Sequence, residues 1–156
     1  MKLRILAVGS RMPAWVRQAF EEYVARLGPA AKLTLTEIAP GLRTAGASAH
    51  KAIATEARRL LAALREGEFV IALDERGTQM STLELARWLQ ARRRDGADLA
   101  FLIGGPDGHA PEVLARSQFT WSLSLLTLPH ALVRVVLAEQ LYRAHAVLGN
   151  HPYHRQ

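Results

Sequence analysis

The sequence alternates short apolar runs, which are typical of buried strands, with longer segments whose apolar residues recur at helical spacing. The apolar runs lie at residues 2–9, 32–38, 69–73, 99–103 and 120–125. The helical segments lie at residues 13–27, 48–64, 81–94, 111–116 and 129–149. Strands that alternate with helices usually pair in parallel. We therefore expect one α/β domain with a mainly parallel sheet and helices on both faces.

Residues between these segments predict how the elements begin and end. Ser81 and Glu84 form a capping box, in which two side chains bind free backbone amides at a helix start. Residues 39–48 are rich in glycine, proline, serine and alanine and predict a loop, the best candidate for a mobile segment. Residues 74–80 predict a polar loop, and residues 150–156 a C-terminal tail.

The composition excludes several kinds of site. Cysteine is absent, which excludes a disulfide scaffold, a thiol nucleophile and any site with cysteine-ligated metal. A chain of 156 residues can bury a sizeable core without such a staple. Every apolar run is far shorter than the roughly 18 residues that cross a membrane, and the first residues do not resemble a signal peptide. We expect a cytoplasmic protein that does not enter a membrane.

The net charge of +6 is unevenly distributed along the chain. Residues 1–65 contain eleven Lys or Arg and four Glu, whereas residues 66–156 contain nine Arg and ten acidic residues. A basic half is typical of proteins that bind a polyanion such as nucleic acid. It is equally typical of a protein that carries arginine on solvated helix faces, so charge alone leaves both interpretations open.

Three predicted strand ends carry unusual residues, and ligands of an open parallel sheet bind beyond such ends. They are residues 73–74, the glycine-rich turn 104–109, and residues 126–130. The turn lacks the spacing of a dinucleotide fingerprint or a phosphate loop, which disfavours NAD, FAD and ATP. It predicts either a tight strand-to-helix turn or a close approach of ligand to backbone. The apolar stretch 123–128 predicts either a buried strand or a wall for a flat heteroaromatic ring.

The last predicted helix is apolar on more than one face, which requires cover on two sides. A second copy of the chain could supply that cover in a homodimer, or the helix could be enclosed within one monomer. His130 and Arg134 lie four residues apart at the start of this helix. They predict either a phosphate-binding pair or a capping histidine beside a solvated arginine.

The tail concentrates side chains that suit RNA chemistry. Histidine can act as a general base near neutral pH, tyrosine stacks on bases, and arginine pairs with phosphate. A disordered tail is the ordinary alternative. Because cysteine and nearby carboxylates are absent, we expect no metal at His151 and His154.

Four segments carry a family resemblance: residues 3–16, 101–108, 122–144 and 150–155. With them the chain resembles, from its first residue to the tail, the ribosomal RNA large-subunit methyltransferase H family of the SPOUT superfamily. The resemblance implies a deep C-terminal trefoil knot, a homodimer, and S-adenosylmethionine bound in the knot. It implies methylation of N3 of a pseudouridine in 23S ribosomal RNA on assembled ribosomes. It implies one such domain over residues 1–156, with 150–156 as a functional tail.

The resemblance also implies roles for individual residues. The implied cofactor site comprises Leu73, Gly104, Gly105, Leu123, Ser124, Leu125, Leu126, Thr127 and Leu128. The implied catalytic residues are His154, Arg155, Tyr153 and Arg134, and those facing the RNA substrate are His130 and His151. We expect His154, from the partner subunit, to be the base at N3. Arg155 and Arg134 would stabilise the imide anion or a phosphate, and Tyr153 would stack on a base.

Two other functions remain open at this point. A non-catalytic ribosome-binding factor would bind RNA but not the methyl donor. A SPOUT methyltransferase for transfer RNA would modify transcripts without ribosomes. The loop residues Thr78 and Arg43 depart from the family pattern, in which these loops are often more basic.

Overall fold

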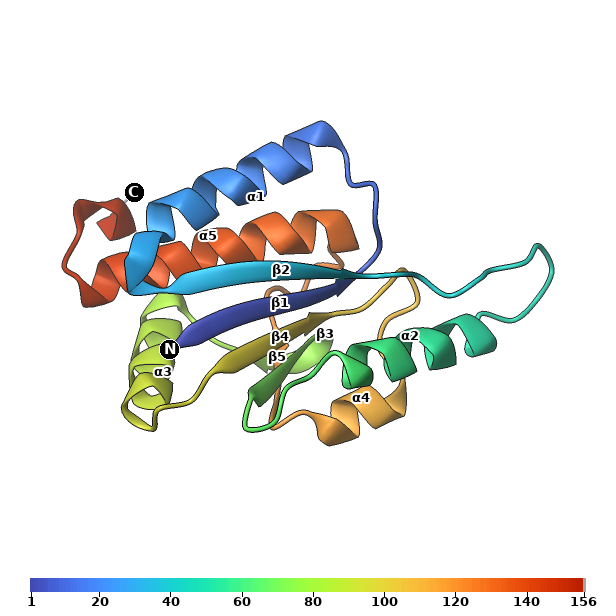
Figure 1. The fold of residues 1–156 in the computed structure, drawn as a ribbon. Coiled ribbons are helices and arrows are strands. Elements are labelled where there is room, and N and C mark those ends of the chain that lie inside the picture. The colour runs from blue at the N-terminus through green and yellow to red at the C-terminus, as the bar shows by residue number, and fades with distance from the viewer. Residues whose placement is uncertain (156) are drawn as a thin grey trace.

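Five parallel strands form the sheet of this computed structural model, which describes residues 1–155. They are β1 (Lys2–Val8), β2 (Lys32–Ile38), β3 (Phe69–Gln79), β4 (Leu99–Ile103) and β5 (Phe119–Ser122). Their order across the sheet is β2-β1-β4-β3-β5, so β4 lies between β1 and β3 (Figure 1). All four pairings are parallel, which confirms the expected sheet. The central strands β1 and β4 are buried almost throughout, whereas the edge strand β2 alternates in burial.

Helices cover both faces of this sheet, as expected (Figure 1). The helices are α1 (Ala14–Leu27), α2 (His50–Ala62), α3 (Thr82–Arg94), α4 (Pro111–Arg116) and α5 (His130–Leu148), with short 3₁₀ turns at Gly28–Ala30 and Pro152–Arg155. One apolar core joins α1, α3 and α5 to the sheet, and a second joins α2 and α4 to the opposite face. The predicted capping box begins α3, where Ser81 Oγ accepts from the Glu84 amide at 3.2 Å.

The structure corrects the predicted bounds of two strands. Residues 74–80 are not a loop, because β3 continues to Gln79 after an irregularity between Leu73 and Thr78. Gly77 permits this second pairing, since a Cβ there would lie 2.7 Å from the Thr120 carbonyl group of β5. The strand predicted at 120–125 ends at Ser122. Side-chain hydrogen bonds then form a turn, in which Ser122 Oγ donates to the Ser124 carbonyl and Ser124 Oγ accepts from the Leu126 amide.

Helix α5 is partly enclosed within the chain. It packs on the sheet between α1 and α3 (Figure 1). Tyr142 of α5 packs against Tyr23 of α1 with ring centroids 6.4 Å apart, and Gln140 accepts from Thr82 of α3 at 2.8 Å. These contacts account for part of its second apolar face, as the enclosed-helix interpretation predicts. Neighbouring helices of the same chain therefore cover some of the apolar residues of α5 that a second copy could otherwise cover.

Candidate functional site

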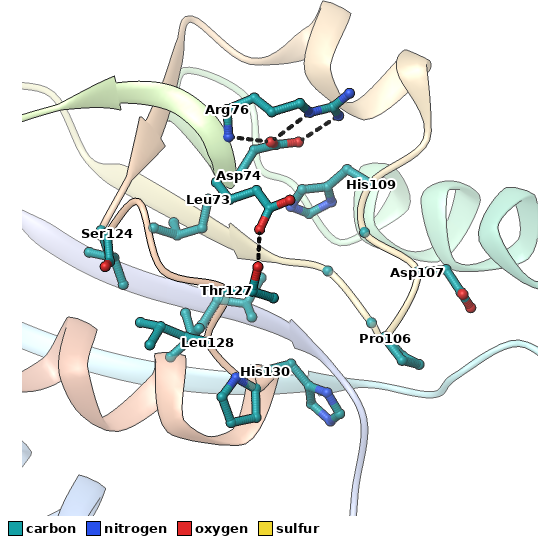
Figure 2. A pocket seen from close by; sticks show the side chains of 18 of the residues that line it. Leu73, Asp74, Arg76, Pro106, Asp107, His109, Ser124, Thr127, Leu128 and His130 are labelled. Atoms are coloured by element: carbon teal, nitrogen blue, oxygen red, sulfur yellow. Dashed lines mark hydrogen bonds and ion pairs between the residues drawn. The ribbon is translucent and has the colours of Figure 1, made fainter.

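A pocket of about 780 Å³ lies at the carboxyl end of the sheet, where β3, β4 and β5 end (Figure 2). Its walls come from residues 73–76 of β3, residues 103–109 at and after the end of β4, and residues 123, 124 and 126–130 after β5. A cavity of this size can hold a drug-sized ligand. All three strand ends that the sequence singled out therefore meet at one site.

Eight of the nine predicted cofactor residues line this pocket. They are Leu73, Gly104, Gly105, Leu123, Ser124, Leu126, Thr127 and Leu128. The ninth, Leu125, lies outside the lining with 83% of its surface exposed. The turn made by Ser124 explains this position, because it replaces the strand that was predicted to continue through residue 125.

The glycine turn is packed too closely, against itself and against Glu56 behind it, to hold larger residues at positions 104 and 105. A Cβ on Gly104 would lie 3.0 Å from the backbone carbon of Gly108, and one on Gly105 would lie 3.1 Å from Glu56 Oε1. Gly108 has a positive φ of 79° and donates its amide to the Gly105 carbonyl. The turn is therefore tight, as the first interpretation predicts, and its residues Gly104 and Gly105 also line the pocket.

His109 is the buried titratable group of the pocket wall. Its Nε2 lies 3.1 Å from the Leu102 carbonyl, and Nδ1 is buried without a hydrogen-bond partner among the described residues. Burial lowers the pKa of His109, so the ring is neutral near pH 7. A neutral ring that donates through Nε2 leaves Nδ1 as an acceptor.

Carboxylates lie at the edge of the pocket nearest β3. Arg76 donates to Asp74 through its backbone and guanidinium, and this hydrogen bonding lowers the pKa of Asp74 (Figure 2). Glu75 accepts from the Thr127 hydroxyl at 2.8 Å. An ionised carboxylate beside an apolar wall favours a ligand that carries positive charge.

His130 and Arg134, which were predicted to act as a pair, have different surroundings. His130 lines the pocket, and partial burial together with the charges of Arg134 and Arg43 lowers its pKa. Arg134 is buried outside the lining, where it bonds Glu37 at 2.9 Å and the Gly9 carbonyl at 3.0 Å. Arg134 is only 2% exposed, so it is not the solvated arginine of the second interpretation. In this conformation Nη1 and Nη2 bind groups of the same chain, and Nε is buried without a partner among the described residues.

The predicted tail residues lie at the other end of α5 from the pocket (Figure 1). The 19 residues of α5 span about 28 Å at 1.5 Å per residue. The pocket begins at its first residue, His130, whereas His151, Tyr153, His154 and Arg155 follow its last turn. The structure therefore does not bring the tail to the pocket of the same chain.

The tail is folded onto α5 rather than extended. The Tyr153 hydroxyl donates to Glu139 at 3.2 Å, and its ring centroid lies 4.6 Å from that of Tyr142. The Arg143 guanidinium lies 4.7 Å from the Tyr153 ring. Burial raises the pKa of Tyr153 further above neutrality. Tyr153 thus fixes the described part of the tail, and Gln156 lies outside the described residues.

Several pocket residues were not among the predicted site residues. Asp74, Arg76, His109 and Trp121 line the pocket, and Trp121 Nε1 is buried without a partner among the described residues. Asp74 and His109 belong to strand ends that the sequence analysis singled out. Arg76 and Trp121 gave no such signal, because their position depends on the second pairing of β3 with β5.

Residues 1–155 contain neither a metal-binding cluster nor a membrane-spanning helix. No group of three or more His, Cys, Asp or Glu residues in this part of the chain is placed to hold a metal ion. No helix within the same range is both long and apolar enough to cross a membrane.

Comparisons with known sequences extend over nearly the whole chain. A family model described as "Predicted SPOUT methyltransferase" matches residues 1–154. A Stenotrophomonas maltophilia protein named "Ribosomal RNA large subunit methyltransferase H" is 54% identical over 155 residues. Proteins with the same name from Xanthomonas campestris and Burkholderia ambifaria are 54% and 50% identical. Each alignment covers 99% of this chain and 99% of the relative.

Solved structures share the fold at low sequence identity. A "probable methylase family protein" from Haemophilus influenzae matches with a TM-score of 0.59 and 16% identity, over 96% of this chain and 69% of that one. A methyltransferase from Legionella pneumophila, solved with bound SAM, matches with a TM-score of 0.50 and 11% identity, over 93% and 66% of the two chains. At these identities the likeness concerns the fold alone.

Proposed function

Because the chain belongs to the SPOUT methyltransferase family, we propose that it methylates N3 of a pseudouridine in 23S ribosomal RNA on assembled ribosomes. The coarser statement, a ribosomal RNA methyltransferase that uses S-adenosylmethionine, rests on the family and on full-length relatives of that name. The observation that carries the proposal is the meeting of eight predicted cofactor residues in one pocket. A ribosomal substrate would place the protein in the cytoplasm.

The pocket fits the methyl donor in size, shape and charge. The glycine turn leaves room where a Cβ of Gly104 would stand, and Leu123, Leu126 and Leu128 supply an apolar wall. Glu75 lies at the edge where a cation is favoured. Once bound, S-adenosylmethionine supplies an electrophilic methyl group, so the chain has only to position the acceptor and remove a proton.

The acceptor nitrogen requires a base. N3 of pseudouridine carries a proton and becomes a good nucleophile as this proton leaves. His154 suits the role, because its Nδ1 contacts the His151 carbonyl, which fixes the tautomer and leaves Nε2 to accept a proton. Arg155 stands beside it to stabilise the imide anion or a phosphate, and His130 and His151 face the RNA. Instead of stabilising the imide anion or stacking on a base, as expected from the sequence, Arg134 and Tyr153 act as positioning residues. Arg134 holds the start of α5 through Glu37 and the Gly9 carbonyl, and Tyr153 holds the tail through Glu139.

The base must come from a second copy of the chain. The tail and the pocket of one chain lie at opposite ends of α5, about 28 Å apart. A two-fold homodimer would bring each tail to the other subunit's pocket. Exposed Leu125 and Leu126 beside the pocket supply apolar surface for such an interface, at 83% and 73% exposure.

We propose also that residues 1–156 form one SPOUT methyltransferase domain with a C-terminal trefoil knot. The return of the chain to β4, between β1 and β3, and the bond from Thr127, after β5, to Glu75 of β3 support a threaded path. Pulling both ends of one molecule would test it. A knotted chain would extend less than its full contour length, and a chain that extends completely would refute the knot.

Mass spectrometry of ribosomal RNA from a strain without the gene tests the reaction. We expect the loss of one N3-methylpseudouridine from 23S RNA and its return with the wild-type gene, but not with His154→Ala. An unchanged RNA would refute the proposal. Purified protein that binds ribosomes but does not titrate with S-adenosylmethionine would favour a non-catalytic factor, and methylation of transfer RNA transcripts would favour the other substrate.

Mixing two inactive variants tests the shared site. Gly104→Val removes the pocket and His154→Ala removes the base, so a heterodimer retains one intact pocket opposite one intact tail. Random reassociation in equal amounts should restore about a quarter of the wild-type sites. If each tail served its own pocket, the mixture would stay inactive. Wild-type turnover by His154→Ala alone would remove the base role from this residue.

A further inference from the structure

The loop between β2 and α2 (residues 39–49) contains one charged residue, Arg43, and its guanidinium is fully engaged. Nη1 and Nη2 donate to Glu56 Oε2 and Oε1 at 2.8 and 3.1 Å, and Nε donates to Asp107 Oδ2 at 2.8 Å. A single arginine in a surface loop would ordinarily be free to bind phosphate. Here it connects two carboxylates of its own chain.

Glu56 depends on this loop for its hydrogen bonds. Glu56 is only 3% exposed. Its carboxylate accepts hydrogen bonds from the Arg43 guanidinium and, at 2.9 Å, from the Gly41 amide, and both of these residues belong to the loop. A buried carboxylate without partners is strongly unfavourable. The loop is therefore held against α2 by the charge of Glu56.

Asp107 extends the same network into the pocket wall. It belongs to the glycine turn, and Figure 2 shows its carboxylate directed away from Thr127 and Leu128, out of the pocket. The Glu56 carboxylate lies directly behind this turn, 3.1 Å from where a Cβ of Gly105 would stand. Arg43 thus braces the outer side of the turn whose inner side lines the pocket.

We propose that Arg43 is a positioning residue that couples the 39–49 loop to the glycine turn of residues 104–108. The docked loop holds the turn in the shape that receives the methyl donor, and an occupied pocket holds the loop in place. Such coupling is reciprocal, since each event stabilises the other by the same free energy. The inference rests on the proposed cofactor site and adds a connection from that site to a surface loop.

Three variants separate coupling from folding. Asp107→Asn weakens the bridge to the turn but keeps the Arg43–Glu56 pair, so the loop remains attached to α2. Arg43→Met removes the whole bridge, and Arg43→Lys keeps the charge without the two-sided contact. Arg58→Met is the matched control, because the side chain of this exposed arginine of α2 forms a hydrogen bond only with Thr55 among the described residues. Thermal unfolding confirms that each variant is folded.

Calorimetric titration with S-adenosylmethionine gives the first measurement. Loss of a hydrogen bond between charged groups predicts about tenfold weaker binding for Arg43→Met and a smaller loss for Asp107→Asn. Arg43→Lys should fall between Arg43→Met and the wild type, and Arg58→Met should match the wild type. On ribosomes, Arg43→Met should raise KM for the methyl donor more than it lowers kcat.

Hydrogen exchange of residues 41–48 gives the second measurement. Saturating S-adenosylmethionine should slow exchange in the wild type and in Arg58→Met, and slow it much less in Asp107→Asn. Equal protection in Asp107→Asn, or unchanged affinity in Arg43→Met, would overturn the coupling while leaving the proposed function intact. A wild type that does not titrate at all would overturn the proposed function itself, and the coupling with it.

Discussion

Thr127 donates its hydroxyl to the Glu75 carboxylate at 2.8 Å, although the two residues are 52 positions apart in the sequence. The bond joins the segment after β5 to the second half of β3, across one side of the pocket (Figure 2). Each partner belongs to a different wall. The bond therefore links two walls of the pocket.

Thr127→Val should weaken binding of S-adenosylmethionine about five- to tenfold. Valine has the same shape but lacks the hydroxyl, and a hydrogen bond to a charged group contributes roughly 1.5–3 kcal/mol, part of which water replaces at this exposed site. Calorimetric titration measures the change. Glu75→Gln keeps an acceptor for Thr127 but removes the negative charge that favours a cationic ligand. A loss of affinity in Glu75→Gln with none in Thr127→Val would show that the charge, and not the hydrogen bond, supports binding.

Gly104→Val should abolish measurable cofactor binding. The first added carbon already lies 3.0 Å from the backbone of Gly108 and 3.3 Å from His109 Nδ1, so the branched side chain must displace the turn or enter the pocket. Gly149→Ala is a suitable control, because its Cβ would meet nothing closer than 3.4 Å. Wild-type affinity in Gly104→Val would show that the turn does not contact the cofactor.

Acid should destabilise the protein through its buried histidines. Burial lowers the pKa of His109, so the unfolded chain binds more protons than the folded chain once the pH falls below about 6.5. The free energy of unfolding should therefore decrease as the pH falls from about 7.5 to 5.5. Urea denaturation at both pH values measures it, with His109→Gln as the comparison. An equal pH dependence in His109→Gln would assign the effect to other groups, such as His130 and His145, whose pKa values burial also lowers.

Tyr153→Ala should lower turnover on ribosomes at least tenfold without changing affinity for the methyl donor. The variant loses the bond to Glu139 and the packing on Tyr142 that fix the tail, whereas the pocket lies at the other end of α5. Tyr153→Phe keeps the ring and should retain most of the turnover. Weaker cofactor binding in Tyr153→Ala would contradict this separation of roles.

The sequence predicts the pocket well because the rule behind it is geometric. The rule singles out residues 73–74, 104–109 and 126–130, because parallel strands place their carboxyl ends at one edge of the sheet. The order of the strands was not needed for this prediction. The individual cofactor residues were instead implied by the family resemblance. Leu125 shows its limit, since whether a residue beyond the strand lines the pocket depends on the turn made by Ser124.

Long-range contacts account for what the sequence did not predict. Residues 74–80 are polar and contain glycine, which locally favours a loop, yet Thr78 pairs with Trp121 in β5. Arg134 illustrates the same limit, because its partner Glu37 is 97 residues away. Neither pairing leaves a periodic signal in the sequence.

The first residue of helix α5 lines the pocket, and the tail follows its last residue. The length of α5 therefore sets the position of the tail relative to the pocket. Each residue added or removed would move the tail by 1.5 Å and rotate it by about 100° around the helix axis. One deletion would carry Tyr153 away from Glu139 and turn His154 to a different side of the molecule. Helix α5 is therefore expected to tolerate substitutions at many positions but no insertion or deletion that leaves a functional enzyme.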